Sequence, residues 1–502
     1  MSPLQLSVYW RLSLIFIFTS FLFFVDIFTV AIAEATCHHD NTSQDTFYRW
    51  NNQSHSVEGP RSQADWRMES RNQESVCGWS DWLPYGQTLF MVGLLLGSLF
   101  GGAVSDRYGK RPLLLASVCV HTLCGLVPAL LPQPLVFLAV RCLTGVCCCC
   151  INICSFPLAV EWTPPAYRLW PPAFLPFCFS LGTMAGAPLA WLSPTWTQLH
   201  LALSVPQLLC LPLYFAIPES PRWLLLRRRT DVLDHYRSSS SEDRQCLDLL
   251  LDSTCCDLQK AMEAPREKPP AGHALRDSVR HLRQPVILLR LFIMSYLSAV
   301  SALTYFGICM NIGSFGVGVH AAQFFSGLSE APCLLVPLIS LRRRPISMLS
   351  LLLSGATCFF SLLLSSYGCE PVLVMSLALM GKLCILAAIF ISTLYSIELF
   401  PTTVRQRCMS LVNLCFRLGC LANSLVPTDP SGSITLAAMV VYSSGPVVGC
   451  VLCLLLPETS GITLPDSIED CNRQPRAPSL GVLCRTLKQR RDDTCRHSPT
   501  SD

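Results

Sequence analysis

Long apolar stretches alternate with short polar ones over most of the chain. The first stretch, 12–33, is nearly all apolar and long enough to cross about 30 Å of hydrocarbon. A polar loop at 34–83 and a polar block at 218–285 divide the remaining stretches into a group of five and a group of six. Those expected segments are 85–105, 113–131, 135–158, 169–192, 198–217, 286–310, 320–341, 346–366, 372–396, 409–426 and 434–456. The pattern predicts an all-α membrane protein with twelve transmembrane helices in two six-helix halves, 1–217 and 286–456.

The first stretch has two interpretations. Ala31-Ile32-Ala33 has the form of a signal-peptide cleavage site, but the apolar run exceeds the roughly 7–15 residues of such signals. The length favours an uncleaved first helix. Asp26 lies inside this helix, where a carboxylate is either an unpaired liability or part of a polar cavity.

Composition supports a membrane protein and excludes several other classes. Of 502 residues, 51% are hydrophobic and 14% charged, whereas average globular chains carry about 25% charged residues. The mean hydropathy is +0.43, and the net charge of +4 gives no sign of a nucleic-acid partner. The 28 cysteines lie mostly in apolar segments, where a thiol behaves as a small hydrophobe, so no metal site is expected.

Enzymatic motifs are missing from the sequence. Gly381-Lys382 is followed by Leu383, so it does not complete a phosphate-binding loop. No combination of nucleophile, base and oxyanion donors is visible. We therefore expect no enzymatic activity and no cofactor.

The distribution of basic residues predicts the orientation in the membrane. Turns near 132, 194, 314, 368 and 429 contain no Lys or Arg, whereas the turns on the opposite side are basic. By the positive-inside rule, both termini, the block 218–285 and the tail 457–502 are cytoplasmic. We expect a multi-pass protein of the plasma membrane. The central block is interpreted as a solvated linker with a few short amphipathic helices.

The loop 34–83 carries features of an extracellular segment. Its two N-x-S/T sequons make Asn41 and Asn52 candidate glycosylation sites. Cys37 and Cys77 are the only thiols of this loop. In an oxidising compartment they form a candidate disulfide, and two free thiols remain the alternative.

A charged turn follows the second expected helix, in the stretch Gly97–Pro112. Gly97, Gly101 and Gly102 give the helix small residues, and the turn then reads Ser-Asp106-Arg107-Tyr-Gly109-Lys-Arg111. Such charges belong in a headgroup or aqueous layer. We interpret this turn as a latch that holds two membrane helices together on the cytoplasmic side. The corresponding turn of the second half, Leu341–Pro345, has neither the Asp nor the Gly, so we expect the two latches to differ, with the better-preserved one in the first half.

Four further motifs lie at expected cytoplasmic helix ends: Ala159-Val-Glu161-Trp162 with Arg168, Pro218-Glu219-Ser-Pro-Arg222-Trp-Leu224, Glu398-Leu-Phe-Pro-Thr-Thr-Val-Arg405 and Pro457-Glu458-Thr-Ser-Gly461. With the charged turn, they resemble the organic ion transporter family of the major facilitator superfamily, over about residues 10 to 470. This family includes organic cation, organic anion and carnitine transporters. The resemblance implies alternating access, by uniport or exchange, around a midplane site. It also implies gating roles for Asp106, Arg107, Gly109, Arg111, Glu161, Arg168, Glu219, Arg222, Glu398 and Arg405.

Charged residues deep in the expected helices are candidates for the substrate site. Arg417 lies about nine residues into its helix, or roughly 14 Å deep, and Lys382 is comparably deep. In the resembling family, the position of Arg417 is acidic in cation transporters and basic in anion and carnitine transporters. Tyr305 and Phe306 would stack on a substrate or simply pack. Glu330 and Asp26 also lie at depth, where acids and bases can neutralise each other as structural pairs.

These observations predict a transporter of a small organic ion, most simply an organic anion, working in a lipid bilayer. One alternative is a zwitterion or cation substrate held by Asp26 or Glu330. A different class of function, a non-transporting scaffold or receptor with the same fold, is motivated by the altered turn at Leu341–Pro345. The sequence does not predict the oligomeric state.

Overall fold

The computed structural model describes residues 2–33, 82–250, 284–332, 342–426 and 436–459, except 132, 165–166, 169, 228, 240, 249, 316, 402–403 and 425. The predicted glycosylation sites Asn41 and Asn52 lie outside these residues. So does the predicted disulfide between Cys37 and Cys77, together with most of the tail.

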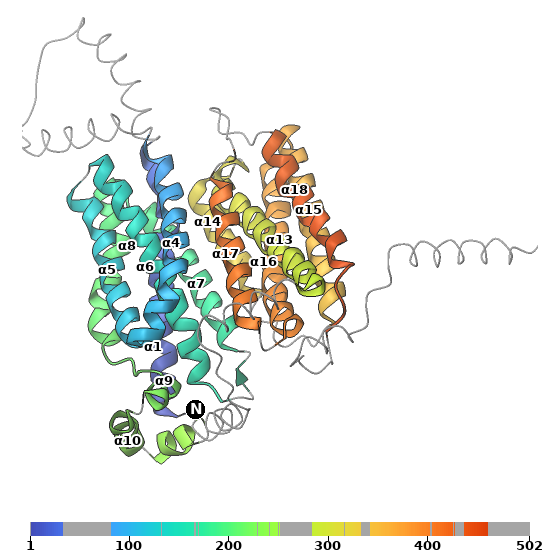
Figure 1. Cartoon of the computed structure of the whole chain (residues 1–502). Coiled ribbons are helices and arrows are strands. Elements are labelled where there is room, and N and C mark those ends of the chain that lie inside the picture. Colours follow the sequence, from blue (N-terminus) through green and yellow to red (C-terminus); the bar gives the residue numbers. More distant parts are fainter. Residues whose placement is uncertain are drawn as a thin grey trace, which may run out of the picture.

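Two helical bundles lie side by side, and the chain completes one before it begins the other (Figure 1). The first bundle contains α1 (Pro3–Phe23), α4 (Pro84–Tyr108), α5 (Lys110–Leu130), α6 (Pro134–Glu161), α7 (Pro171–Trp191) and α8 (Trp196–Tyr214). The second contains α13 (Pro285–Met310), a 3₁₀ turn η3 (Ile312–Phe315), α14 (Val319–Glu330), α15 (Arg343–Ser366), α16 (Pro371–Leu399), α17 (Arg405–Asn423) and α18 (Leu436–Cys453).

Eight helices of the described residues are long and apolar enough to cross a membrane. The first of these runs from Pro3 to Ala33, because the chain continues α1 as a helix beyond a bend at Phe24. The other four helices, α8, α14, α17 and α18, occupy the remaining predicted segments and are shorter or more polar within the described residues. The twelve helices thus follow the predicted apolar pattern.

The first helix is an integral part of its bundle. Val8, Leu12 and Ile15 are fully buried in the core cluster of this half. A segment packed in this way contributes to the core of the first bundle, and its interpretation as an uncleaved helix stays a prediction.

Glycine allows α4 and α6 to pack closely. A Cβ atom added to Gly93 would lie 2.0 Å from the carbonyl oxygen of Cys142, and one added to Gly97 would lie 2.7 Å from Cys149 Cβ. Gly101 also faces α6, whereas a Cβ on Gly102 would meet nothing within 4 Å. Small residues at such positions let membrane helices approach backbone to backbone.

The described part of the central block forms short helices, as predicted, but they pack against the first bundle, so its interpretation as a solvated linker is wrong there. It forms α9 (Pro221–Leu226), α10 (Thr230–Ser239) and a helical segment over 241–248. Leu233, Leu247 and Leu250 are buried in the core cluster of the first bundle. The side chain of Asp243 accepts a hydrogen bond of 3.1 Å from the backbone N–H of Leu4. Figure 1 shows α9 and α10 at the same end of the molecule as the N-terminus.

The two bundles meet along α7 with α14 and along α4 with α17. Gly327 of α14 lies so close to α7 that an added Cβ would be 2.8 Å from Met184 Cγ. Aromatic contacts join α1 to the second bundle: Phe23 stacks on Phe306 with ring centroids 6.0 Å apart, and Phe28 stacks on His320 at 5.4 Å. The halves are therefore in contact around a largely apolar, aromatic centre.

Candidate functional site

Glu219 joins the charged turn after α4 to the segment before α9. Its carboxylate accepts hydrogen bonds from the backbone N–H groups of Lys110 and Arg111, at 3.2–3.3 Å, and of Ser220, at 2.9 Å. Lys110 and Arg111 are the first two residues of α5, so the carboxylate caps the positive end of that helix. Burial raises the pKa of Glu219, and these N–H groups partly offset that effect. We define Glu219, Lys110, Arg111, Glu161 and Ser220 as the first latch.

Glu161 binds two other members of the first latch, and Gly109 makes room for Glu219. Glu161 forms an ion pair with Lys110 and accepts a hydrogen bond from the Ser220 hydroxyl. Gly109 has a φ of +103°, and a Cβ there would lie 2.6 Å from Glu219 Oε2. The glycine is required because the carboxylate occupies the space that a side chain would need.

The second bundle contains the same network, which we call the second latch. Glu458 accepts hydrogen bonds from the backbone N–H groups of Arg343, at 2.9 Å, and Arg344, at 3.3 Å, the first two residues of α15. Arg343 forms an ion pair with Glu398 at 3.1 Å, and Thr459 donates to Glu398 at 2.7 Å. The expectation of asymmetric latches is therefore wrong, because the bonding uses backbone N–H groups that any residue provides.

The remaining predicted gating residues take different places. Arg168 Nε donates to the Thr163 carbonyl at 3.4 Å, and Arg405 Nε donates to the Phe400 carbonyl at 3.1 Å, so these two also correspond. Asp106, Arg107 and Arg222 are exposed. Asp106 contributes its carbonyl to the Trp223 indole and Arg107 its carbonyl to Arg227. Their side chains make no ion pair with described residues in this conformation.

Glu330 lies at the centre of a buried polar cluster between the bundles. It forms an ion pair with Lys382, with 2.7 Å between Oε1 and Nζ, and accepts hydrogen bonds from Tyr305 at 2.6 Å and from Ser180 at 2.7 Å. Lys382 is fully buried and also donates to the Ser326 carbonyl at 3.2 Å. Ser180 belongs to α7, so its hydroxyl connects the first bundle to a carboxylate of the second.

Asp26 has a counter-charge within its own bundle. It forms an ion pair with Arg141 of α6, and both side chains are buried. Arg141 also donates to the Leu22 carbonyl at 2.8 Å and lies over the ring of Phe90, 4.6 Å from its centroid. This pair is neutral as a unit, which makes a carboxylate at that depth tolerable.

Arg417 differs from the other deep charges. It is half-buried, and no carboxylate of a described residue lies within 4.0 Å of it. It belongs to α17, which packs against α4 of the first bundle, and its guanidinium carbon lies 5.6 Å from the ring centroid of Phe416. Its neighbour Phe416 packs on the aromatic cluster that contains Phe23 and Phe306. Among the described residues, Arg417 is thus a cation without a carboxylate partner, and it lies next to an apolar, aromatic cluster.

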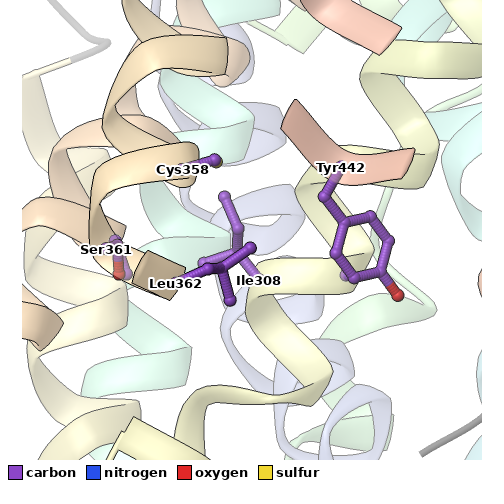
Figure 2. A pocket seen from close by; sticks show the side chains of 7 residues that line it. Ile308, Cys358, Ser361, Leu362 and Tyr442 are labelled. Carbon is purple, nitrogen blue, oxygen red and sulfur yellow. The ribbon is translucent and has the colours of Figure 1, made fainter. Parts of the chain in front are cut away.

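A small cavity in the second bundle is not a substrate site. It measures about 10 Å³ and is lined by Gly307, Ile308, Cys358, Ser361, Leu362, Ala378 and Tyr442 (Figure 2). This volume holds at most one water molecule.

Sequence reasoning assigned no functional role to four of these residues, although Glu458 stands in one of the motifs: Arg141, Ser180, Arg343 and Glu458. A signal existed for Arg141, since it is a lone cation inside the expected segment 135–158 and Asp26 needs a counter-charge. Ser180 gives no signal, because one serine in an apolar helix has many structural roles.

Comparisons with known proteins identify the family. A model of the Major Facilitator Superfamily matches residues 78–424. Solute carrier family 22 member 13 of Homo sapiens is 33% identical over 398 residues, which are 78% of this chain and 70% of that protein. Organic anion transporter 3 of Oryctolagus cuniculus is 28% identical over 403 residues, 79% of this chain and 72% of that protein.

Solved structures agree on the fold. The xylose transporter XylE from E. coli, in a partially occluded inward-open conformation, superposes with a TM-score of 0.62. The match covers 92% of this chain and 100% of that chain at 14% sequence identity. The chain belongs to the Major Facilitator Superfamily and, within it, to solute carrier family 22. It is a transmembrane transporter and not an enzyme.

Proposed function

We propose that this transporter carries small organic anions and that Arg417 binds the anionic group. The proposal rests on which of the charged residues inside the membrane helices have a partner of opposite charge. Asp26 is neutralised by Arg141 and Glu330 by Lys382, whereas Arg417 has no carboxylate partner among the described residues. An anionic substrate would supply the missing counter-charge.

The surroundings of Arg417 support an organic body on that anion. Phe23, Phe306 and Phe416 form an aromatic cluster beside Arg417 at the junction of the two bundles. The name of a relative, organic anion transporter 3, agrees with this substrate class. A zwitterion or cation held by Asp26 or Glu330 is less favoured, because both carboxylates already have partners.

The two latches favour transport by alternating access, in preference to a role as a non-transporting scaffold or receptor. Each latch fixes the end of one bundle where an α-helix begins, and the described residues of the two bundles meet largely through apolar and aromatic contacts. Rocking of one bundle against the other would then leave each latch intact.

The proposed membrane topology follows the sequence. Both termini and the central block would be cytoplasmic, the loop 34–83 extracellular with glycans at Asn41 and Asn52 and a disulfide between Cys37 and Cys77, and the plasma membrane the site of action. Removal of the glycans by a glycosidase applied outside intact cells tests this arrangement.

Uptake of a panel of labelled organic anions into expressing cells tests the substrate class. Arg417→Ala should abolish uptake, Arg417→Lys should retain part of it, and Arg407→Ala should leave it unchanged. Arg407 is a matched control because it is an exposed arginine on the same helix. Uptake of cations alone, or uptake of anions unaffected by Arg417→Ala at equal surface expression, would overturn the proposal.

A further inference from the structure

A second cavity lies at the end of the first bundle that carries α9 and the N-terminus. It measures about 160 Å³ and is lined by Pro157, Val160, Glu161, Arg168, Pro221, Arg222 and Leu250. A water molecule takes about 30 Å³ of liquid volume, so this cavity has room for several waters or for one small anion. It lies beside the first latch, far along α6 from the Asp26–Arg141 pair.

The charges around this cavity are unequal. Both oxygens of the Glu161 carboxylate are already engaged, one by Lys110 and the other by Ser220. Arg168 uses its Nε on the Thr163 carbonyl, and no described residue accepts from its terminal nitrogens. Arg222 makes no hydrogen bond or ion pair with the described residues. The cavity therefore presents two guanidinium groups with unused donors next to a carboxylate that is already satisfied.

We propose that this cavity is a binding site for a phosphate group, held between Arg168 and Arg222. A guanidinium group offers two parallel N–H donors that match the oxygens of a phosphate, and two such groups satisfy one dianion. The apolar side chains of Pro157, Val160 and Leu250 leave space for the carbon body attached to it. Under the proposed topology this site faces the cytosol, where the phosphate group belongs either to a small soluble molecule or to a phospholipid.

Occupancy would connect three parts of the first half. Arg168 lies between α6 and α7, Arg222 is the second residue of α9, and Leu250 belongs to the packed central block. A bound phosphate group would bridge these elements next to Glu161, and so would stabilise the first latch.

The second half does not repeat the site. Arg405 corresponds to Arg168, but the segment Pro457-Glu458-Thr459-Ser460-Gly461 has glycine where Pro218-Glu219-Ser220-Pro221-Arg222 has arginine. The second cation is therefore missing from the second half. The latches are alike in structure, and this difference in charge is specific to the first.

Thermal unfolding of the full-length protein in phosphatidylcholine nanodiscs tests the proposal, with inorganic phosphate as the probe and chloride at equal ionic strength as the reference. Phosphate should raise the melting temperature in a saturable manner. Arg168→Gln and Arg222→Gln should each raise the half-saturating phosphate concentration by about tenfold or more, the loss expected for one hydrogen bond to a charged group. Arg229→Gln, which removes an exposed arginine outside the cavity, should leave it unchanged.

Two further arms separate the source of the phosphate and the place of binding. If nanodiscs containing phosphatidic acid stabilise the wild type without free phosphate, and Arg222→Gln removes that gain, a phospholipid supplies the group. If Arg417→Ala abolishes the phosphate effect while Arg168→Gln and Arg222→Gln do not, phosphate binds at the midplane and this proposal fails while the proposed function stands. The absence of any shift in the wild type in both bilayers also overturns it.

Discussion

Glu458 and Glu219 occupy equivalent positions in the two halves. Each carboxylate accepts hydrogen bonds from the first two backbone N–H groups of the third helix of its half. Next to each, a second acid, Glu398 or Glu161, binds a basic side chain and a hydroxyl group. The two latches are thus formed by the same kinds of hydrogen bond and ion pair, although the sequences of the two turns differ.

Glu458→Gln should destabilise the protein as much as Glu219→Gln does. Each substitution weakens the acceptor for at least two backbone N–H groups, which costs about 1–3 kcal/mol. Melting temperatures of the purified proteins measure the effect, and Glu370→Gln, at an exposed carboxylate, serves as the control. A loss confined to Glu219→Gln would show that only the first latch matters.

Gly109→Ala should be strongly destabilising, whereas Gly102→Ala should not. The backbone of Gly109 has a φ of +103°, a region that costs other residues about 1–3 kcal/mol, and a Cβ would meet Glu219 Oε2 at 2.6 Å. A Cβ on Gly102 meets nothing within 4 Å and favours the helix by about 0.5–1 kcal/mol. Thermal unfolding compares the two variants, and equal melting temperatures would contradict the role assigned to Gly109.

Ser180→Ala and Tyr305→Phe should each destabilise the protein by removing one hydrogen bond to Glu330. Hydrogen bonds to a charged group contribute about 1.5–3 kcal/mol, and the two variants should be non-additive because they share one acceptor. A double-mutant cycle on melting temperatures measures the coupling. Ser329→Ala is the matched control, since its hydroxyl donates only to the Ser326 carbonyl on its own helix. Strict additivity would mean that the Glu330 cluster does not act as a unit.

Substituting one partner of the Asp26–Arg141 pair should destabilise the protein more than substituting both. Asp26→Asn or Arg141→Gln leaves one buried charge uncompensated, at a cost of about 3–5 kcal/mol. The combined change Asp26→Leu with Arg141→Met eliminates both charges and should recover much of the folded protein. The yield of monodisperse protein and its melting temperature report the outcome. A double variant no better than the single ones would argue against a structural ion pair.

The apolar pattern predicted the positions of the helices, because membrane solvation sets their length and period. The partners of the deep charges were harder to predict. Asp26 and Arg141 are 115 residues apart, and Ser180 and Glu330 are 150 apart, so only the packing of the helices brings them together. Arg417 was predicted from its depth and from the resemblance to the organic ion transporter family, and its role in binding stays a prediction.

The second latch shows why the sequence motif did not predict an equivalent network in the second half. The search required an Asp and a Gly, yet the donors to Glu458 are backbone N–H groups, which leave no mark on the sequence. Arg342 occupies the position that corresponds to Gly109 in the first half. Its φ is −62°, a backbone conformation that does not require glycine. The backbone part of the latch therefore requires only the acceptor carboxylate of Glu458.

The hydrogen bond from Leu4 to Asp243 joins residues separated by 239 positions. During synthesis, the start of the first helix leaves the ribosome long before its partner exists. The helix end gains this cap, and the core around Val8 and Leu12 gains Leu247 and Leu250, only after all six helices of the first half have been made. The core of the first half is therefore complete only when the chain extends to residue 250, beyond the last of its six membrane helices.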